Sequence, residues 1–293
     1  MNFTLIGNKI KELRKSVGFS QEEIAEGICS QAQICKIEKG EVTPSATTLY
    51  LIAERLGVDI NFFFDTAKTP RLDYVQEVEF QLRKETRSHD FKAVKEIVQA
   101  ELNNPLFTQN KENFQLLLWH KGFSDHATGT PYSEVLQTLK EALSLTHQSE
   151  KVWSEREIDI LNAIGVIYMK EQLYSDALKT FDNAIKYIHR RPIIRDDSLL
   201  VRILYNKAMV LTRLEDYEAS IKMCEQAINC SIKNDSMYIF GYLYYQMGYN
   251  YELMKENRRA IHYLNKSISF FEIQKEHKFL DYIKERIDNL EAA

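Results

Sequence analysis

The sequence predicts an all-α protein in which a small bundle of short helices precedes an α-solenoid of helix pairs. The 293 residues include only 10 Gly and 5 Pro, so few positions interrupt helices. Between them, apolar residues recur every three or four positions, which is the period of amphipathic helices. In the second half, a pattern of small and large residues also recurs about every 40 residues. The length favours two folding units.

The first two helices of the bundle carry clear start and stop signals. The first is predicted from Leu5 to Gly18, where glycine can take the left-handed conformation that ends a helix. The second begins after Ser20, and Glu23 three residues later completes the signature of a capping box. Its buried stripe is expected to consist of Ile24, Ala25 and Ile28.

The third predicted helix follows a turn at Cys29 and Ser30 and ends at Gly40. Ile34 and Ile37 are expected to face the core. The remaining positions point outward and carry short or flexible side chains, the kind that reach base edges in a DNA major groove. These positions are Gln31, Ala32, Gln33, Cys35 and Lys36.

Two further helices complete the bundle as a five-helix helix-turn-helix domain. One spans Leu49 to Leu56, and the last covers residues 60–64. The motifs Ser20-Gln21-Glu22-Glu23-Ile24-Ala25, Ile34-x-x-Ile37-Glu38-x-Gly40-x-x-x-Pro44-Ser45 and Leu49-x-x-Ile52-Ala53-x-x-Leu56-Gly57-Val58 resemble the Cro/C1 or XRE helix-turn-helix family. The turn between the second and third helices is one residue shorter than the usual family pattern.

This resemblance implies which residues contact DNA. The third helix would enter the major groove, while Gln21, at the start of the second helix, would bond a backbone phosphate. Gln pairs with adenine and Lys with guanine acceptors, so both types suit base reading. The base-reading candidates are Gln31, Gln33 and Lys36. Lys39 and Thr43 are expected to contact phosphates, which position a protein without specifying sequence. A solvated helix face is the alternative for the two lysines.

The charge of the first domain limits how tightly it can bind DNA alone. The chain carries a net charge of -4, and residues 1–65 hold seven Lys and Arg against nine Asp and Glu, a net -2. Because phosphate neutralisation needs Lys and Arg, contact must use a local basic face. Binding as a dimer would supply the remaining affinity.

Three segments of the second half share one spacing. Each has a small, large, small, large and small residue at intervals of 3, 9, 4 and 3 positions. Small residues are required where two antiparallel helices cross closely, and large ones fill the space beside the crossing. The segments are Gly165, Tyr168, Ala177, Phe181, Ala184, then Ala208, Leu211, Ser220, Cys224, Ala227, and then Gly248, Tyr251, Ala260, Leu264, Ser267.

This pattern resembles the tetratricopeptide repeat, with copies 43 and then 40 residues apart instead of about 34. Weaker copies precede it: a helix over 116–123 is followed by one around 132–142, and a helix over 75–82 by one around 93–100. About five helix pairs and a capping helix over 279–290 are therefore predicted.

The first helix of each pair is expected to line a concave wall that holds a ligand. A carboxamide both donates to and accepts from a peptide backbone, which suits Asn162 and Asn206 to clamping an extended peptide. Arg202 offers a cation for a carboxylate, and Tyr offers apolar contact with a polar tip. With 16 Tyr in the chain, packing between repeats is the alternative for each of them. The predicted peptide-binding residues are Asn162, Met169, Arg202, Asn206, Met209, Tyr242, Tyr245, Gln246 and Tyr249, and Tyr205 is expected on the same wall.

The whole chain resembles the RNPP group of quorum-sensing regulators of Gram-positive bacteria, and within it the PlcR type. The residues that carry this resemblance are Asn162-Ala163-Ile164, Tyr205-Asn206-x-Ala208 and Leu243-Tyr244-Tyr245-Gln246-x-Gly248. It implies a cytoplasmic homodimer in which a short imported signalling peptide controls binding to a two-fold symmetric operator. The expected organisation is residues 1–65 for DNA binding, 66–72 as a linker, and 73–293 for peptide binding and dimerisation.

Two other classes of protein remain open at this point. The repeats of an interaction scaffold would bind a protein partner. An enzyme is disfavoured, because the seven His are scattered and no Gly-rich phosphate loop occurs. No cofactor, metal site or catalytic residue is predicted, and no apolar run reaches the roughly 18 residues of a membrane span. Free, partly buried thiols are expected at Cys29, Cys35, Cys224 and Cys230.

Overall fold

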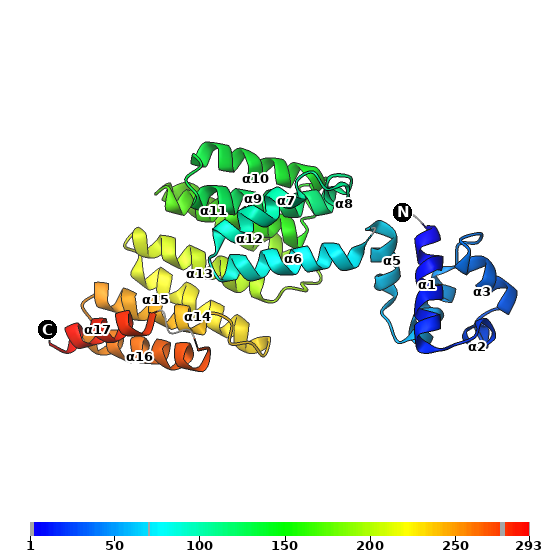
Figure 1. Cartoon of the computed structure of the whole chain (residues 1–293). Coiled ribbons are helices and arrows are strands. Elements are labelled where there is room, and N and C mark those ends of the chain that lie inside the picture. The colour runs from blue at the N-terminus through cyan, green and yellow to red at the C-terminus, as the bar shows by residue number, and fades with distance from the viewer. Residues whose placement is uncertain (1–2, 70, 276–278, 293) are drawn as a thin grey trace. The chain divides into compact units, whose positions relative to one another are not determined.

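The computed structural model describes residues 3–69, 71–275 and 279–292 of the chain. Throughout these residues the regular secondary structure is helical, and Cα packing divides the chain into two compact units, Met1–His120 and Lys121–Ala293. Figure 1 labels the helices in chain order. The predicted all-α fold is confirmed.

The first five helices enclose one small core. They are α1 (Phe3–Val17), α2 (Gln21–Ala25), α3 (Gln31–Glu38), α4 (Ala46–Leu56) and α5 (Ile60–Lys68). The largest buried side chains of this core come from every one of the five helices, and include Ile6, Ile10, Ile24, Ile34, Ile37, Leu49, Ile52 and Phe63. Each helix therefore depends on the others for burial of its apolar stripe.

The predicted caps are present, with two differences in helix length. Ser20 Oγ accepts from the Glu23 amide at 3.1 Å, and Glu23 Oε2 accepts from the Ser20 amide at 2.6 Å, which completes the capping box. However, α2 ends at Ala25, so Ile28 packs on the core from the turn that follows. In addition, α5 continues to Lys68, so the first three residues of the expected linker are helical.

A buried ion pair joins the first and third helices. Glu38 is 3% exposed and Arg14 is 8% exposed. Arg14 Nε lies 2.6 Å from Glu38 Oε1, and its Nη2 lies 3.2 Å from Oε2. Arg14 Nη1 also donates to the carbonyl of Phe19 at 2.6 Å. The guanidinium thus holds the end of α3, the turn before α2 and its own helix together.

The pKa of Glu38 follows from this environment. Burial alone would raise it, but the hydrogen bonds from Arg14 and Gln21 and the charges of Arg14 and Lys11 outweigh burial and lower it. A carboxyl whose pKa is lowered on folding stabilises the protein above its unfolded pKa of about 4.3. That contribution is lost as the pH falls through the folded pKa.

Three helices and the first part of a fourth complete the first compact unit. They are α6 (Leu72–Arg87), α7 (Phe91–Glu101), α8 (Pro105–Thr108) and α9 (Lys111–Ala127), which continues into the second unit. The short helix α8 was not predicted, although Asn104 before Pro105 is a favourable start signal. Phe107, fully buried, anchors α8 in the core of this region.

The second unit consists mainly of antiparallel helix pairs. Figure 1 shows α11 to α16 following one another as stacked layers, with the C-terminus on α17. Together with α6–α7 and α9–α10, these helices confirm about five pairs and a final capping helix. Their bounds are α10 (Tyr132–Thr146), α11 (Glu155–Lys170), α12 (Tyr174–His189), α13 (Ser198–Arg213), α14 (Tyr217–Lys233), α15 (Phe240–Leu253), α16 (Asn257–Ile273) and α17 (Leu280–Glu291).

The small residues of the repeat lie where paired helices touch. A Cβ added to Gly165 in α11 would lie 2.4 Å from Cε1 of Phe181 in α12. A Cβ added to Gly248 in α15 would lie 2.8 Å from Cγ of Leu264 in α16. Because real Cβ contacts are longer, these pairs can approach so closely only with glycine at the crossing.

Neither a membrane-spanning helix nor a disulfide is found among the residues that the structure describes. Within residues 3–69, 71–275 and 279–292, no helix has both the length and the apolar character needed to cross a bilayer. All four cysteines lie in these ranges and all are free thiols, as expected. Burial raises the pKa of Cys224.

We predict that Gly165→Val destabilises the α11–α12 pair by about 2–3 kcal/mol, because the fully buried Phe181 ring has no space to move. Hydrogen exchange in α11 and α12, measured by mass spectrometry, should accelerate accordingly. Phe181→Leu in the same chain should recover part of the loss. Unchanged exchange in the single variant would show that the crossing tolerates a side chain.

We predict that Glu38→Gln costs about 3–5 kcal/mol, because it leaves the Arg14 guanidinium buried without a counter-charge. Hydrogen exchange in α1 to α3 of the full chain reports the loss. The gap from the unmodified chain should shrink as the pH falls from about 4.3, where Glu38 of the unfolded chain takes up a proton, and close below the lowered pKa of Glu38 in the folded chain. The matched double variant Arg14→Met with Glu38→Leu should regain most of the stability. A gap that is independent of pH would contradict this account.

Candidate functional site

Helix α3 presents a polar row on the outside of the bundle. Ile34 and Ile37 are buried at 0% and 1% exposure, as predicted. Ser30 caps the helix, because its Oγ accepts from the amide of Gln33 at 3.2 Å. The outward residues differ in accessibility: Gln31, Ala32 and Lys36 are exposed, while Gln33 and Cys35 are half-buried. Of the three base-reading candidates, Gln31 and Lys36 are therefore accessible, while Gln33 is only partly so.

Gln21 is already engaged within the protein. Its Nε2 donates to Glu38 Oε2 at 2.8 Å, and its Oε1 accepts from Gln31 Nε2 at 2.8 Å. A carboxamide nitrogen carries two N–H donors, so the bond to Glu38 leaves one donor of Gln21 for the predicted phosphate contact, which stays a prediction. These hydrogen bonds form a continuous network from the buried Arg14 through Glu38 and Gln21 to the surface of α3. The network orients Gln31, the first residue of the helix.

The two predicted phosphate contacts are exposed. Lys39 is the C-terminal cap of α3, and its ammonium lies 4.0 Å from a carboxylate oxygen of Glu41, with both side chains more than half exposed. An ion pair of this kind is screened by water and leaves the lysine able to bind an anion. Thr43 is exposed in the segment between α3 and α4.

Asn162 and Asn206 lie side by side on neighbouring first helices. Asn206 Nδ2 in α13 donates to Asn162 Oδ1 in α11 at 2.9 Å. Within the described part of the chain, no other side-chain hydrogen bond is found for these two residues. Asn162 Nδ2 thus offers a donor, and Asn206 Oδ1 offers an acceptor. A peptide backbone presents the complementary pair of groups.

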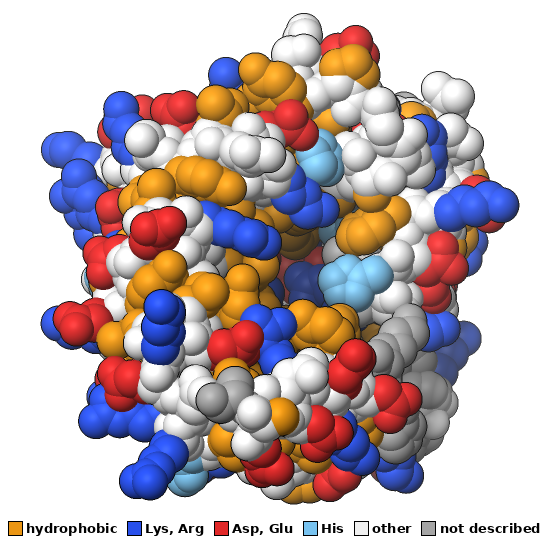
Figure 2. Space-filling model, turned by 90° about the vertical axis from the view of Figure 1, so that its left-hand side faces the viewer, with side chains coloured by type: hydrophobic (Ala, Val, Ile, Leu, Met, Phe, Trp, Pro, Cys, Tyr) orange, Lys and Arg blue, Asp and Glu red, His pale blue; other side chains and the backbone are white. Residues whose placement is uncertain are grey.

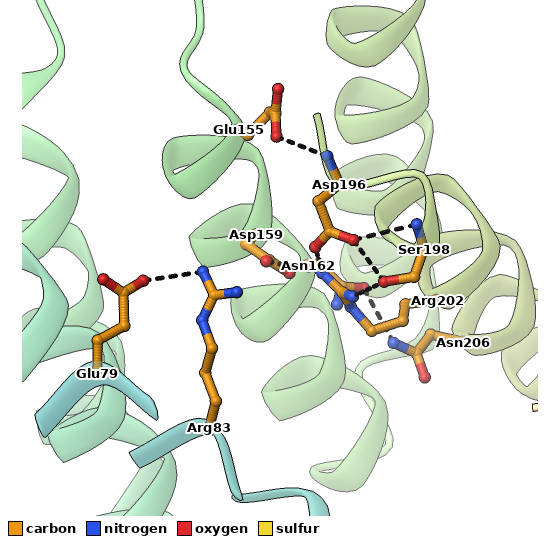
Figure 3. Close-up of polar contacts among 9 residues, drawn as sticks. All are labelled: Glu79, Arg83, Glu155, Asp159, Asn162, Asp196, Ser198, Arg202 and Asn206. Carbon is orange, nitrogen blue, oxygen red and sulfur yellow. Dashed lines mark hydrogen bonds and ion pairs between the residues drawn. The ribbon is translucent and has the colours of Figure 1, made fainter. Parts of the chain in front are cut away.

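Arg202 is already paired with neighbouring side chains, which counts against its expected role as a carboxylate receptor. Figure 3 shows its guanidinium between two carboxylates: Nη2 lies 2.8 Å from Asp159 Oδ2 and 3.1 Å from Asp196 Oδ2. Its Nη1 also donates to Ser198 Oγ at 2.5 Å. Burial would lower the pKa of Arg202, but the two carboxylates outweigh burial and raise it. A ligand carboxylate would find this cation already neutralised.

The predicted residues of α15 divide between two faces. Tyr242, Tyr245 and Tyr249 are half-buried and share one side of the helix, and the Tyr245 and Tyr249 rings stack with centroids 6.3 Å apart. Gln246 is turned inward at 5% exposure, and its Nε2 donates to Thr212 Oγ1 at 2.6 Å. The placement of Gln246 on the ligand wall is therefore corrected, because it holds α15 against α13.

Met169 and Met209 are half-buried, in α11 and α13 respectively. Residues of α16 and α17 that the sequence analysis did not single out complete the aromatic surface around α15. Phe271, Phe279 and Tyr282 have ring centroids 4.9–6.4 Å from those of Tyr242 or Tyr245. The prediction of a capping helix over 279–290 was the available signal, since a cap must pack on the last pair.

Charge is mixed on the face of the molecule that Figure 2 draws. Figure 2 shows Lys, Arg, Asp and Glu side chains interspersed over the face that it draws, with hydrophobic side chains exposed between them. Among the described residues, no group of three or more His, Cys, Asp and Glu is arranged to hold a metal ion.

Known families match both parts of the chain. Residues 10–63 match the helix-turn-helix family, and residues 79–289 match the RNPP family C-terminal domain. A curated relative, an uncharacterized HTH-type transcriptional regulator y4dJ of Sinorhizobium fredii, is 35% identical over 68 residues, which span 22% of this chain and 88% of that protein.

Solved structures share the fold along nearly the whole chain. PlcR of Bacillus thuringiensis in complex with the peptide PapR7 and DNA has a TM-score of 0.88 at 24% identity, covering 96% of this chain and 99% of that chain. ComR from S. thermophilus in complex with DNA and its signalling peptide ComS has a TM-score of 0.65 at 18% identity, covering 97% and 99%. The RNPP family C-terminal domain matches more than half of the residues of this chain. The chain therefore belongs to the RNPP family.

Proposed function

We propose that this chain is a cytoplasmic, homodimeric transcription regulator whose binding to operator DNA is controlled by a short imported signalling peptide. One observation carries the proposal: a helix-turn-helix domain and an RNPP C-terminal domain occupy the same chain. The solved PlcR structure contains DNA and the peptide PapR7, and the solved ComR structure contains DNA and its signalling peptide.

The proposed DNA contacts follow from the accessible side of α3. Gln31, held by Gln21, together with Gln33 and Lys36 would read base edges, while Lys39 and Thr43 would contact phosphates. Residues 1–65 carry a net charge of -2, so a single copy would bind DNA weakly. Two copies on a two-fold symmetric operator would double the contacts.

The proposed peptide site is the surface formed by the first helices α11, α13 and α15. The Asn162–Asn206 pair would bond the peptide backbone, and Tyr242, Tyr245 and Tyr249 would contact its side chains. We propose that residues 73–293 form this peptide-binding and dimerisation domain and that residues 1–65 bind DNA. The connection between them would lie between the end of α5 at Lys68 and the start of α6 at Leu72.

Control of DNA binding by a peptide requires a minimum difference in free energy. A peptide can change DNA affinity only by as much as its own affinity differs between two conformations of the protein. A tenfold change requires about 1.4 kcal/mol. Gel shifts with the full chain and genomic fragments test the function directly, with and without C-terminal fragments of a small secreted peptide encoded beside the gene. Failure to shift any fragment in either condition would contradict it.

We predict that Gln33→Ala and Lys36→Ala change the operator sequence that the full chain prefers, because each bidentate base contact discriminates by about 1–3 kcal/mol. Selection from a randomised DNA pool measures the preference. Lys140→Ala, on the exposed side of α10, removes the same charge away from α3 and is the matched control. Identical preferences in all variants would place the reading surface elsewhere.

We predict that Asn162→Ala weakens peptide binding about three- to tenfold, through loss of a backbone hydrogen bond, and leaves peptide-free DNA binding intact. Titration calorimetry with a responsive peptide and a gel shift without it give the two measurements. Asn265→Ala, exposed on α16, is the matched control. Loss of basal DNA binding with normal peptide affinity would overturn the assignment of Asn162.

A further inference from the structure

An apolar pocket of about 160 Å³ lies in the second compact unit, beside the proposed peptide surface. Tyr205 of α13 and Tyr242 and Tyr245 of α15 form one side. Phe271 of α16, together with Phe279 and Tyr282 at the start of α17, forms the other. Tyr205 and Asn206 are consecutive residues of α13, so the pocket and the amide pair use the same turn of that helix. A peptide bonded to those amides would have the pocket within reach of a side chain.

The size of the pocket fits one aromatic ring. An engineered protein cavity of about 150 Å³ lined by apolar side chains stays dry and binds benzene. The present pocket has a similar volume, is lined by six aromatic side chains and Ile283, and is partly open to solvent, so that a side chain can enter it. Burial raises the pKa values of the Tyr205 and Tyr245 hydroxyls, which is consistent with little water at its walls.

The aromatic rings that form the pocket walls meet in the edge-to-face geometry that aromatic pairs prefer. The Tyr242 ring meets the Phe271 ring at 4.9 Å and 89°, and the Phe279 ring at 5.7 Å and 77°. It also meets Tyr205 at 6.3 Å and 63°. These are edge-to-face contacts, in which the positive edge of one ring faces the negative face of another. A further ring entering the pocket would extend the same arrangement, whereas an aliphatic side chain would gain only burial.

Arg286, which does not line the pocket, holds the Tyr282 side of the pocket in place. Arg286 Nη1 donates to the Tyr282 hydroxyl at 2.7 Å, and the Arg286 guanidinium lies 4.6 Å from the centroid of the Tyr249 ring. Arg286 is itself paired with Glu252 of α15. These contacts tie α17 to α15 across the pocket, so its shape is formed before a ligand arrives.

We propose that this pocket is the subsite for a single phenylalanine side chain of the peptide ligand. The proposal rests on the proposed function, because it assigns a residue type to the peptide bound by the same surface. It gives the C-terminal helix a role in recognition, since Phe279 and Tyr282 supply two of the six aromatic side chains that line the pocket.

The test uses the full chain and two small probes, N-acetyl-phenylalanine amide and N-acetyl-alanine amide, followed by ligand-observed NMR. The phenylalanine probe should bind at least about tenfold more tightly, since only it buries a ring. Phe279→Ala and Tyr282→Ala should each abolish this preference. Tyr132→Ala is the matched control, because Tyr132 is 41% exposed and Phe279 is 43% exposed. Circular dichroism verifies that each variant is folded.

The outcomes separate this subsite from the proposed function. Equal binding of the two probes, or equal effects of Phe279→Ala and Tyr132→Ala, would overturn the subsite. A heptapeptide library selected on the full chain should enrich phenylalanine at one position, and peptides that alter DNA binding without such enrichment would overturn the subsite alone. A probe that fills the pocket while no selected peptide changes DNA binding would support the ring site and contradict the proposed function.

Discussion

The solenoid depends on the close approach of the two helices in each pair. At Gly165 the backbone of α11 lies so near Phe181 that even a methyl group would overlap the ring. Gly248 and Leu264 repeat this relation in α15 and α16. Close crossings fix how far each first helix stands from its partner, and hence where its remaining faces point. On two of these first helices, α11 and α13, the amides of Asn162 and Asn206 meet at 2.9 Å.

A different interaction organises the small bundle. The Arg14–Glu38 pair is buried and satisfied, and Gln21 extends it to Gln31 on the surface of α3. A buried ion pair adds little to stability compared with apolar packing, but removing one partner is costly. In this bundle the ion pair orients other side chains. The hydrogen-bond network that begins at the pair links the core to the first residue of the proposed reading helix.

The sequence predicted those features that depend on local spacing. The five short helices, the Ser20 capping box and the repeated helix pairs all follow from residues close together in the chain. The interior position of Glu38 was missed, because it stands between Lys36 and Lys39 and has its partner 24 positions away. Arg202 is neutralised by Asp196, six positions away, and by Asp159, 43 positions away, and only the first of these partners lies close to it in the sequence. Gln246 follows Tyr245 directly in α15. Its side chain nevertheless points away from the proposed ligand wall and donates to Thr212.

The central claim is that the peptide and the operator are coupled through one protein. Coupling of this kind is reciprocal, so each ligand must change the affinity of the other by the same factor. The most direct measurement is the dissociation constant of operator DNA with and without saturating peptide, together with that of the peptide with and without saturating DNA. The account predicts equal factors, both different from one. No change in either constant, although both ligands bind, would contradict it.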